Sequence, residues 1–190
     1  MTQIQSQKAQ LRKIFRDERA KRFALSKSDE PLFAHLLKVP EIAKAKCVTS
    51  YFSINDEPGT TTLNLALISA GKTVLLPRVL GRTLEWVQWD GKKSSLAECR
   101  GLLEPVGPAI ADFSIIDAVI VPTLRIDRQG FRLGQGGGFY DRALPGMPGW
   151  RVGLIYEYEL SEDPLPNEVH DMKLNAVATS NSLIRFNGTE

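Results

Sequence analysis

The chain has 190 residues, 43% of them hydrophobic and 24% charged, so it is large enough to bury a core of ordinary size. Its formal net charge of +2 is far from that of a dedicated nucleic-acid binder and fits a small anionic ligand better. The sequence has neither an apolar leader nor a run of about eighteen apolar residues. We therefore expect one domain over residues 1–190, cytoplasmic and monomeric, with no nucleic-acid or membrane partner.

The first predicted element is a helix over residues 4–22 with a basic face. Its cations recur at intervals of three or four positions, at Lys8, Arg12, Arg16 and Arg19. A solvated charged surface is one interpretation of this stripe. The other is that Lys8 and Arg12, one turn apart, reach toward phosphates held elsewhere in the chain.

The next elements are a helix and a strand that ends in polar turn residues. A Ser-Asp-Glu-Pro helix start at residues 28–31 precedes an apolar stripe, and Pro40 is expected to end this helix. Residues 47–54 are β-branched and aromatic, which predicts a strand leading into the turn 55–59. Ligands of open α/β sheets bind beyond the carboxyl ends of strands, where Phe52 and Glu57 would lie. A solvent-exposed turn carboxylate is the alternative for Glu57.

The remaining elements alternate between helix and strand. A helix capped by the threonines at 60–62 should extend to about Ala70, and residues 103–108 should form a loop. Strands are expected at 72–77, 84–90, 117–122, 150–155 and 175–179. Trp86 and Trp89 should lie on opposite faces of their strand. This order predicts an α/β fold with a largely parallel sheet flanked by helices.

A glycine-rich stretch at residues 125–144 is the most specialised part of the sequence. Gly134 and the triple glycine 136–138 lie between the strand at 117–122 and a short helix predicted at 140–144. Successive amides in such a turn can hold an anion, although a flexible turn is the simpler interpretation. Arg132 and Arg142 on either side favour the anion site. The stretch lacks the Lys-Ser/Thr pair of a Walker A loop, and Phe139 stands at the last glycine position of G-x-G-x-x-G.

Late in the chain, His170 and Asp171 form a polar pair. The pair could cap a turn, or Asp171 could join Asp141 in holding a metal ion.

The segment RIDRQGFRLGQGGGFYDR resembles the motif of 5-formyltetrahydrofolate cyclo-ligases, roughly F-D-x-x-G-x-R-L-G-x-G-x-G-Y-Y-D-R. Four other segments follow the family's order and spacing: Lys8 with Arg12, Phe52 to Glu57 followed by Thr60, the strand at 119–122, and His170-Asp171. The resemblance implies an α/β fold similar to the NagB/RpiA/CoA-transferase-like group. It also implies an enzyme that uses ATP and Mg²⁺ to convert 5-formyltetrahydrofolate into 5,10-methenyltetrahydrofolate, releasing ADP and phosphate.

The resemblance also implies roles for individual residues. ATP contacts fall on Lys8, Arg12, Arg132, Leu133, Gly134, Gln135, Gly136, Gly137, Gly138, Phe139 and Tyr140. Folate contacts fall on Phe52, Glu57 and Tyr140, metal ligands on Asp141 and Asp171, and catalytic roles on Arg132, Tyr140 and Asp141.

Three positions depart from the family's pattern. Ile126 replaces a Phe, Phe139 replaces a Tyr, and Asn175 stands where an Asp often follows the His-Asp pair. Asn175 weakens any expectation of a third metal carboxylate. A sugar-phosphate isomerase or phosphosugar-binding protein of the same fold group is an alternative function, and a non-enzymatic nucleotide- or folate-binding module is another.

Overall fold

The structure is a computed structural model, and it describes residues 2–25 and 33–186. Its α-helices are α1 (Gln3–Leu25), α2 (Pro40–Lys44), α3 (Thr61–Ser69) and α4 (Phe139–Ala143). Short 3-10 helices are η1 (Phe33–Lys38), η2 (Lys93–Ser95), η3 (Phe113–Ile115), η4 (Leu144–Gly146) and η5 (Glu157–Glu159). The strands are β1 (Cys47–Thr49), β2 (Thr73–Leu80), β3 (Thr83–Trp89), β4 (Leu96–Cys99), β5 (Leu102–Pro105), β6 (Ala118–Pro122), β7 (Arg125–Asp127), β8 (Arg132–Leu133), β9 (Trp150–Leu154), β10 (Leu160–Ser161), β11 (Ala176–Ala178) and β12 (Leu183–Arg185).

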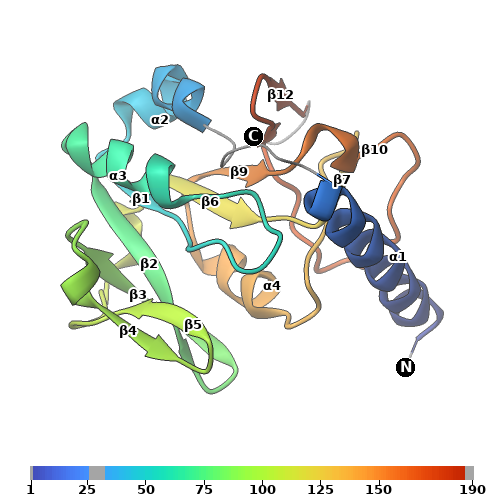
Figure 1. Cartoon of the computed structure of the whole chain (residues 1–190), viewed down its shortest axis with the longest axis horizontal. Helices are drawn as coiled ribbons and strands as arrows, with labels where there is room; N and C mark the ends of the chain where they lie inside the picture. Colours follow the sequence, from blue (N-terminus) through green and yellow to red (C-terminus); the bar gives the residue numbers. More distant parts are fainter. Residues whose placement is uncertain (1, 26–32, 187–190) are drawn as a thin grey trace.

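The largest sheet has seven strands in the order β12-β11-β9-β6-β1-β2-β3 (Figure 1). Its five inner strands run parallel, and an antiparallel strand closes each edge. The inner strands β1, β6 and β11 are buried on both faces, which is why their sequences are mostly apolar and do not alternate. The predicted α/β class with a largely parallel sheet is confirmed.

Each face of this sheet has its own apolar core. On one face, η1, α2 and α3 cover the sheet with residues such as Leu36, Ile42 and Leu67. On the other, α4 and η4 pack against it through Leu144 and neighbouring side chains. Figure 1 shows α2 and α3 on one side of the sheet and α4 on the other. Trp86 and Trp89 belong to different cores, as their odd spacing predicted.

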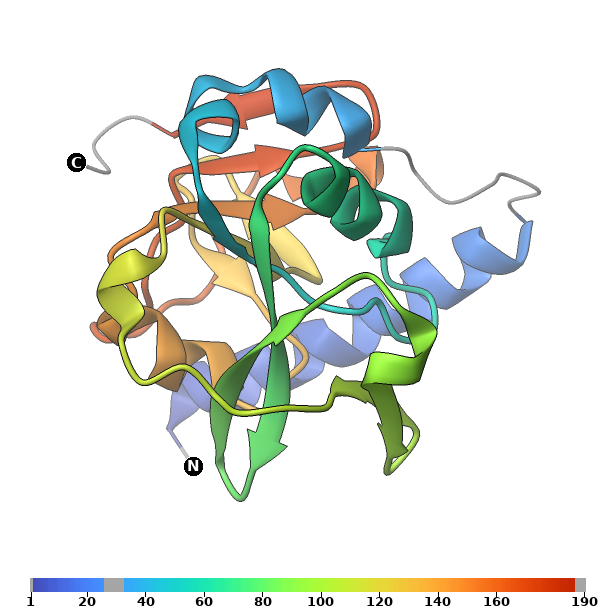
Figure 2. The ribbon, with the colours of Figure 1, turned by 90° about the vertical axis from the view of Figure 1, so that its left-hand side faces the viewer.

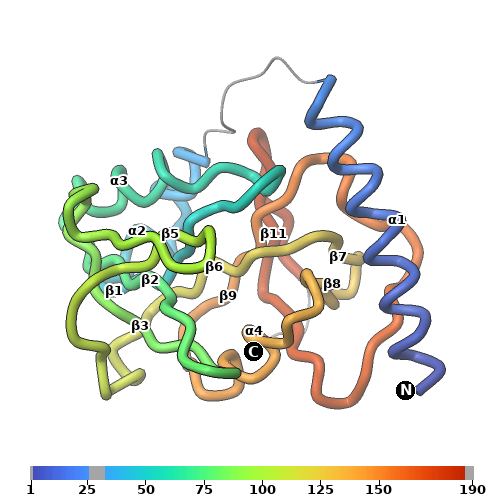
Figure 3. Tube along the Cα trace, turned by 60° about the horizontal axis from the view of Figure 1, so that its bottom comes forward, coloured from blue at the N-terminus to red at the C-terminus, as the bar shows by residue number. Residues whose placement is uncertain are grey.

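A second, three-stranded sheet, β10-β7-β8, lies beside α1 (Figures 1 and 3). Arg19 joins the two with a buried ion pair: its guanidinium donates to Glu159 at 2.5 and 2.8 Å and to the carbonyl oxygen of Thr123 at 2.7 Å. The Arg19 and Glu159 side chains are 1% and 2% exposed. The first helix is therefore held to the chain that follows β6.

The hairpin β4–β5 packs against β2, beside the long β2–β3 ribbon (Figure 2). The buried Glu104 of β5 accepts a hydrogen bond from the Val79 amide at 3.0 Å, which ties the hairpin to the ribbon. The prediction of a plain loop over residues 103–108 is wrong for its first half. The strand pairing there depends on residues 96–99, a partner that local composition did not indicate.

Three other local predictions need correction. Pro40 begins a helix, α2, because proline is accommodated in a first turn, where its missing N–H is not needed. The strand from Cys47 ends at Thr49, since residues 50–54 turn away into a loop. Thr60 is the N-cap residue of α3 but makes no side-chain cap bond. The helix start predicted at residues 28–31 lies outside the described residues.

Candidate active site

A pocket of about 820 Å³ opens beyond the carboxyl ends of β1 and β6. Its size falls within the range of about 300–1,000 Å³ typical of small-molecule sites. Among the residues that the sequence indicated, it brings together Arg12, Phe52, Glu57, Arg132, Gly134, Gln135, Gly136, Gly137, Gly138, Phe139, Tyr140 and Asp141. Lys8 and Asp171 lie outside its lining, and the Leu133 side chain is buried in the core. Segments far apart in the chain thus share one cavity.

One wall of the pocket is aromatic and is built by the loop that follows β1. The Phe52 ring meets Trp89 edge to face, with 5.0 Å between ring centroids. Thr60 holds this loop, because its hydroxyl donates to the Tyr51 carbonyl oxygen at 2.5 Å and accepts from the Ser53 amide at 3.1 Å. Because the Thr60 hydroxyl makes these two bonds, it does not form the side-chain cap hydrogen bond expected at the start of α3. The loop is rigidly attached to the start of α3.

Glu57 is a buried carboxylate on this wall, 8% exposed, and not a solvated turn residue. Its oxygens accept hydrogen bonds from the Ile54 amide at 3.2 Å and from the Gln135 side-chain amide at 3.4 Å. Burial raises the pKa of Glu57 above its usual value, against the opposing effects of the Ile54 amide, Arg19 and Gln135. A ligand with paired N–H donors would compensate this buried charge.

The opposite wall is the glycine loop between β8 and α4. Gly136 and Gly138 have φ values of 100° and 66°, which L side chains rarely adopt. A Cβ on Gly136 would also lie 3.3 Å from the Arg12 side chain. Gly134 differs: a Cβ there would meet nothing within 4 Å, so the space beside it is open. Arg142 braces the loop by donating to the Gly137 carbonyl oxygen at 2.9 Å.

Two cations on the basic face of α1 contact this loop. Arg12 donates through Nε to the Gly134 carbonyl oxygen at 3.0 Å, and Arg16 donates to both the side-chain and main-chain oxygens of Gln135. Lys8 is 6% exposed. The interpretation of the stripe as a solvated surface is therefore wrong for Lys8 and Arg12, whereas Arg16 contacts the loop from an exposed position.

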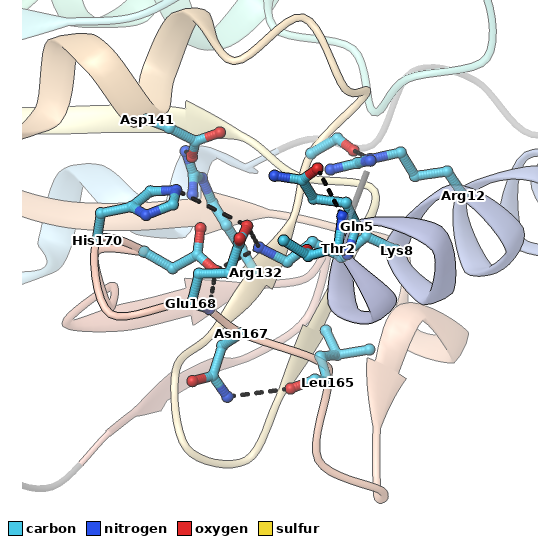
Figure 4. Close-up of polar contacts among 12 residues, drawn as sticks. Thr2, Gln5, Lys8, Arg12, Arg132, Asp141, Leu165, Asn167, Glu168 and His170 are labelled. Carbon is cyan, nitrogen blue, oxygen red and sulfur yellow. Dashed lines mark hydrogen bonds and ion pairs between the residues drawn. The ribbon is translucent and has the colours of Figure 1, made fainter.

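The two predicted metal carboxylates are each paired with a cation. Arg132, whose side chain is 4% exposed, donates to Asp141 at 2.6 Å, and Lys8 forms an ion pair with Asp171. Lys8 also contacts Glu168 at 3.3 Å. Figure 4 shows Lys8 pointing from α1 toward the loop that carries Glu168, with Arg132 and Asp141 beyond it.

Electrostatics connect these groups further. Asp141, Asp171 and Glu168 all act on the pKa of Arg12, which burial lowers and these carboxylates raise. Burial acts to raise the pKa of Asp171, but hydrogen bonds from Lys8 and the Glu168 amide bring it below its usual value. Within residues 2–25 and 33–186, no group of three or more His, Cys, Asp or Glu side chains could hold a metal ion.

Tyr140 lies between the two walls. Its ring meets Trp86 edge to face at 6.1 Å, and its buried hydroxyl has no hydrogen-bond partner in the described part of the chain. Burial and the nearby Glu57 carboxylate raise the pKa of Tyr140 far above its usual value, so the hydroxyl stays protonated. A buried hydroxyl without a hydrogen-bond partner destabilises the fold unless a ligand supplies that hydrogen bond.

Several site residues escaped the sequence-based prediction. Arg16 belongs to the predicted basic stripe, but nothing in the sequence indicated a contact for it. Glu168 could have been found from its position three residues before Asp171, which places it in the same loop. Trp89, Tyr51 and the β4–β5 hairpin line the pocket through long-range packing that no local pattern signals.

These features define an α/β protein whose one pocket joins cations and a glycine loop on one wall to an aromatic ring and a buried carboxylate on the other. The sequence model of the 5-formyltetrahydrofolate cyclo-ligase family matches residues 4–180. The chain belongs to this family.

Individual relatives agree with this membership. A 5-formyltetrahydrofolate cyclo-ligase of Mycolicibacterium smegmatis is 33% identical over 144 residues, which are 70% of this chain and 73% of that protein. One of Haemophilus influenzae is 30% identical over 178 residues, 87% of this chain and 93% of that protein. The solved structure of Aquifex aeolicus 5,10-methenyltetrahydrofolate synthetase has a TM-score of 0.81 at 27% identity, covering 96% of this chain and 94% of that one.

Proposed function

We propose that the chain catalyses the ATP-dependent cyclisation of 5-formyltetrahydrofolate to 5,10-methenyltetrahydrofolate, with release of ADP and phosphate. The observation that carries the proposal is one pocket lined on one wall by Phe52 and Glu57 and on the other by the arginine-flanked glycine loop. Family membership favours this reaction over the sugar-phosphate and non-enzymatic alternatives.

The chemistry requires activation of an amide oxygen, which leaves poorly until it is phosphorylated. The formyl oxygen attacks the γ-phosphorus of ATP and displaces ADP. N10 then attacks the activated carbon, and loss of phosphate and of the N10 proton gives the methenyl product. Because charge neutralisation around the transferred phosphoryl group dominates such reactions, the catalytic work falls mainly on cations and oriented amides. We assign this role to Lys8, Arg12 and Arg132 together with the loop from Leu133 to Tyr140.

Magnesium would enter with the nucleotide. Two carboxylates suit Mg²⁺, which takes its other ligands from phosphate oxygens and water, and Asp141 and Asp171 provide them. When bound, the ion would neutralise charge on the phosphates. Both carboxylates now pair with Arg132 and Lys8, so the binding of Mg-ATP requires an exchange of partners in which the cations turn to phosphate oxygens.

The folate ring system would lie against Phe52, with its aminopyrimidine edge donating to Glu57. A planar pterin is well accommodated by an aromatic wall, and a carboxylate accepts two parallel N–H donors with good geometry. Tyr140 lies where the two ligands would meet, and its protonated hydroxyl can donate to the folate or to a phosphate oxygen. Together with Arg132 and Asp141, it forms the proposed catalytic group.

The test is direct. Purified protein with Mg-ATP and 5-formyltetrahydrofolate should produce the near-ultraviolet absorbance of the methenyl product and one ADP for each product formed. Absence of both at every substrate concentration would refute the proposal, and heat release with sugar phosphates but not with ATP would favour the isomerase alternative.

The wider setting is also proposed. We expect the 190 residues to act as one monomeric domain in the cytoplasm, without nucleic-acid or membrane partners. No helix among the described residues has the length and apolarity needed to cross a membrane.

A further inference from the structure

We propose that Gln135 is a positioning residue for folate: Arg16 fixes its side-chain amide, and the amide in turn holds the Glu57 carboxylate in its receiving orientation. The inference rests on the proposed function, because it takes Glu57 as the folate anchor. Under this inference the glycine loop contributes to the binding of both ligands. The loop's main chain serves the nucleotide, while one of its side chains serves folate.

The first step is the hold of α1 on Gln135. Arg16 donates through Nε to Gln135 Oε1 at 2.9 Å, and a second guanidinium nitrogen donates to the Gln135 main-chain oxygen. A planar guanidinium that binds two oxygens of one residue sets the direction of both. With Oε1 facing the arginine, the Nε2 amide group of Gln135 must point away from α1.

The second step is the contact with Glu57. Gln135 Nε2 donates to Glu57 Oε1 at 3.4 Å, while the Ile54 amide donates to Oε2 at 3.2 Å. Each carboxylate oxygen therefore receives one bond from the protein. A carboxylate oxygen can accept two, so each keeps capacity for a ligand donor. Two supports from opposite walls of the pocket stop the carboxylate from rotating.

The contact also matters for charge. Burial acts against ionisation of Glu57, and the Gln135 amide is one of the few groups that favour its charged form. Other titratable or charged groups that act on Glu57 or feel its charge include Arg19 on α1, Asp56 in its own loop, and Tyr51, Tyr140 and Tyr156. Of these only Arg19 is a cation, and Glu159 already engages it.

Two substitutions separate this role from simple tethering of the loop. Gln135→Met removes both side-chain contacts at similar size. Gln135→Glu keeps an acceptor for Arg16 but places a negative charge beside Glu57 in place of a donor. Lys13→Met is the matched control, because it removes a cation from an exposed position on the same helix.

The measurements are the KM values for 5-formyltetrahydrofolate and for ATP, the pH profile of kcat/KM for folate, and calorimetric binding of folate without ATP. We expect Gln135→Met to raise the folate KM and Kd about fivefold to tenfold, less than the usual effect of a hydrogen bond to a charged group because this bond is long, at 3.4 Å, and Gln135 is exposed. Gln135→Glu should raise them further. Loss of the Gln135 donor raises the pKa of Glu57, so the acidic limb of the kcat/KM profile for folate should move to higher pH in both variants. Lys13→Met should have the same profile and the same constants as the wild type.

The outcomes are distinguishable. If Gln135→Glu behaves as wild type, or if only the ATP KM changes, Gln135 tethers the loop or binds nucleotide and the inference is wrong. An unmoved acidic limb in an otherwise weakened Gln135→Met variant would also overturn it. If the wild-type protein itself forms no methenyl product, the proposed function fails first.

Discussion

The buried pair between Arg19 and Glu159 should dominate the stability of the helix α1 attachment. In Arg19→Met, the Glu159 carboxylate is left without its cation in a site that is 2% exposed, and the carbonyl oxygens of Thr123 and Leu124 lose their donor. Removing one partner of a buried ion pair costs about 3–5 kcal/mol. At about 2–4 °C per kcal/mol for a chain of this size, the melting temperature should fall by about 6–20 °C.

Urea unfolding followed by far-ultraviolet circular dichroism measures this loss. The double variant Arg19→Met/Glu159→Gln should be less destabilised than the sum of the two single variants, since the second change removes the uncompensated charge. Arg22→Met is the control: its side chain is 55% exposed and pairs with Glu18 on the surface, so it should cost no more than about 1 kcal/mol. If Arg19→Met lowers the free energy of unfolding by no more than Arg22→Met does, the reasoning is refuted.

Three further predictions concern the site and its support. Burial raises the pKa of Glu57 above its usual value, so kcat/KM for folate should decline along an acidic limb as pH falls, with a midpoint above that of an ordinary glutamate. In Glu57→Gln that limb should vanish and the folate KM should rise with the ATP KM unchanged; an unchanged folate KM removes Glu57 from the site. Arg132→Ala leaves Asp141 unpaired and removes a phosphate donor, so calorimetry should show ATP bound about tenfold more weakly or worse, and unaltered affinity would exclude the arginine. Gly153→Ala would put a Cβ 2.8 Å from the Thr123 hydroxyl oxygen. The free energy of unfolding in urea should fall by about 1–3 kcal/mol. Wild-type stability would mean that β9 shifts enough to accommodate the methyl group without cost.

Local patterns in the sequence were sufficient for the parallel core of the fold. The β-branched apolar run at β6 and the short segment at β9 are typical of buried strands, and the helix α1 followed from its regular spacing. The β4–β5 hairpin could not be foreseen in the same way. Its exposed, mixed residues gain their structure from pairing with each other and from packing on β2.

The candidate site shows the same division. Phe52, Glu57 and the glycine loop line one pocket. Strand ends and glycines mark these residues singly in the sequence, whereas their assignment to a common site came from the resemblance to the family. The direction in which the α1 cations point was left open, since a basic stripe has the same sequence whether it faces solvent or a loop of carbonyl oxygens. Only the position of α1 against the glycine loop decides it.

The burial of Asp127 has a consequence for protein engineering. This carboxylate, 1% exposed, accepts hydrogen bonds from the amides of Gln129 and Phe131 in the turn before the glycine loop, and from the amide of Leu165 in the segment that leads to Asp171. One side chain thus fixes the position of the turn before the glycine loop relative to the segment that begins at Leu165, almost forty positions away in the sequence. A chimera that exchanges the glycine loop with that of a relative should therefore work only if the segment before Asp171 is transplanted with it.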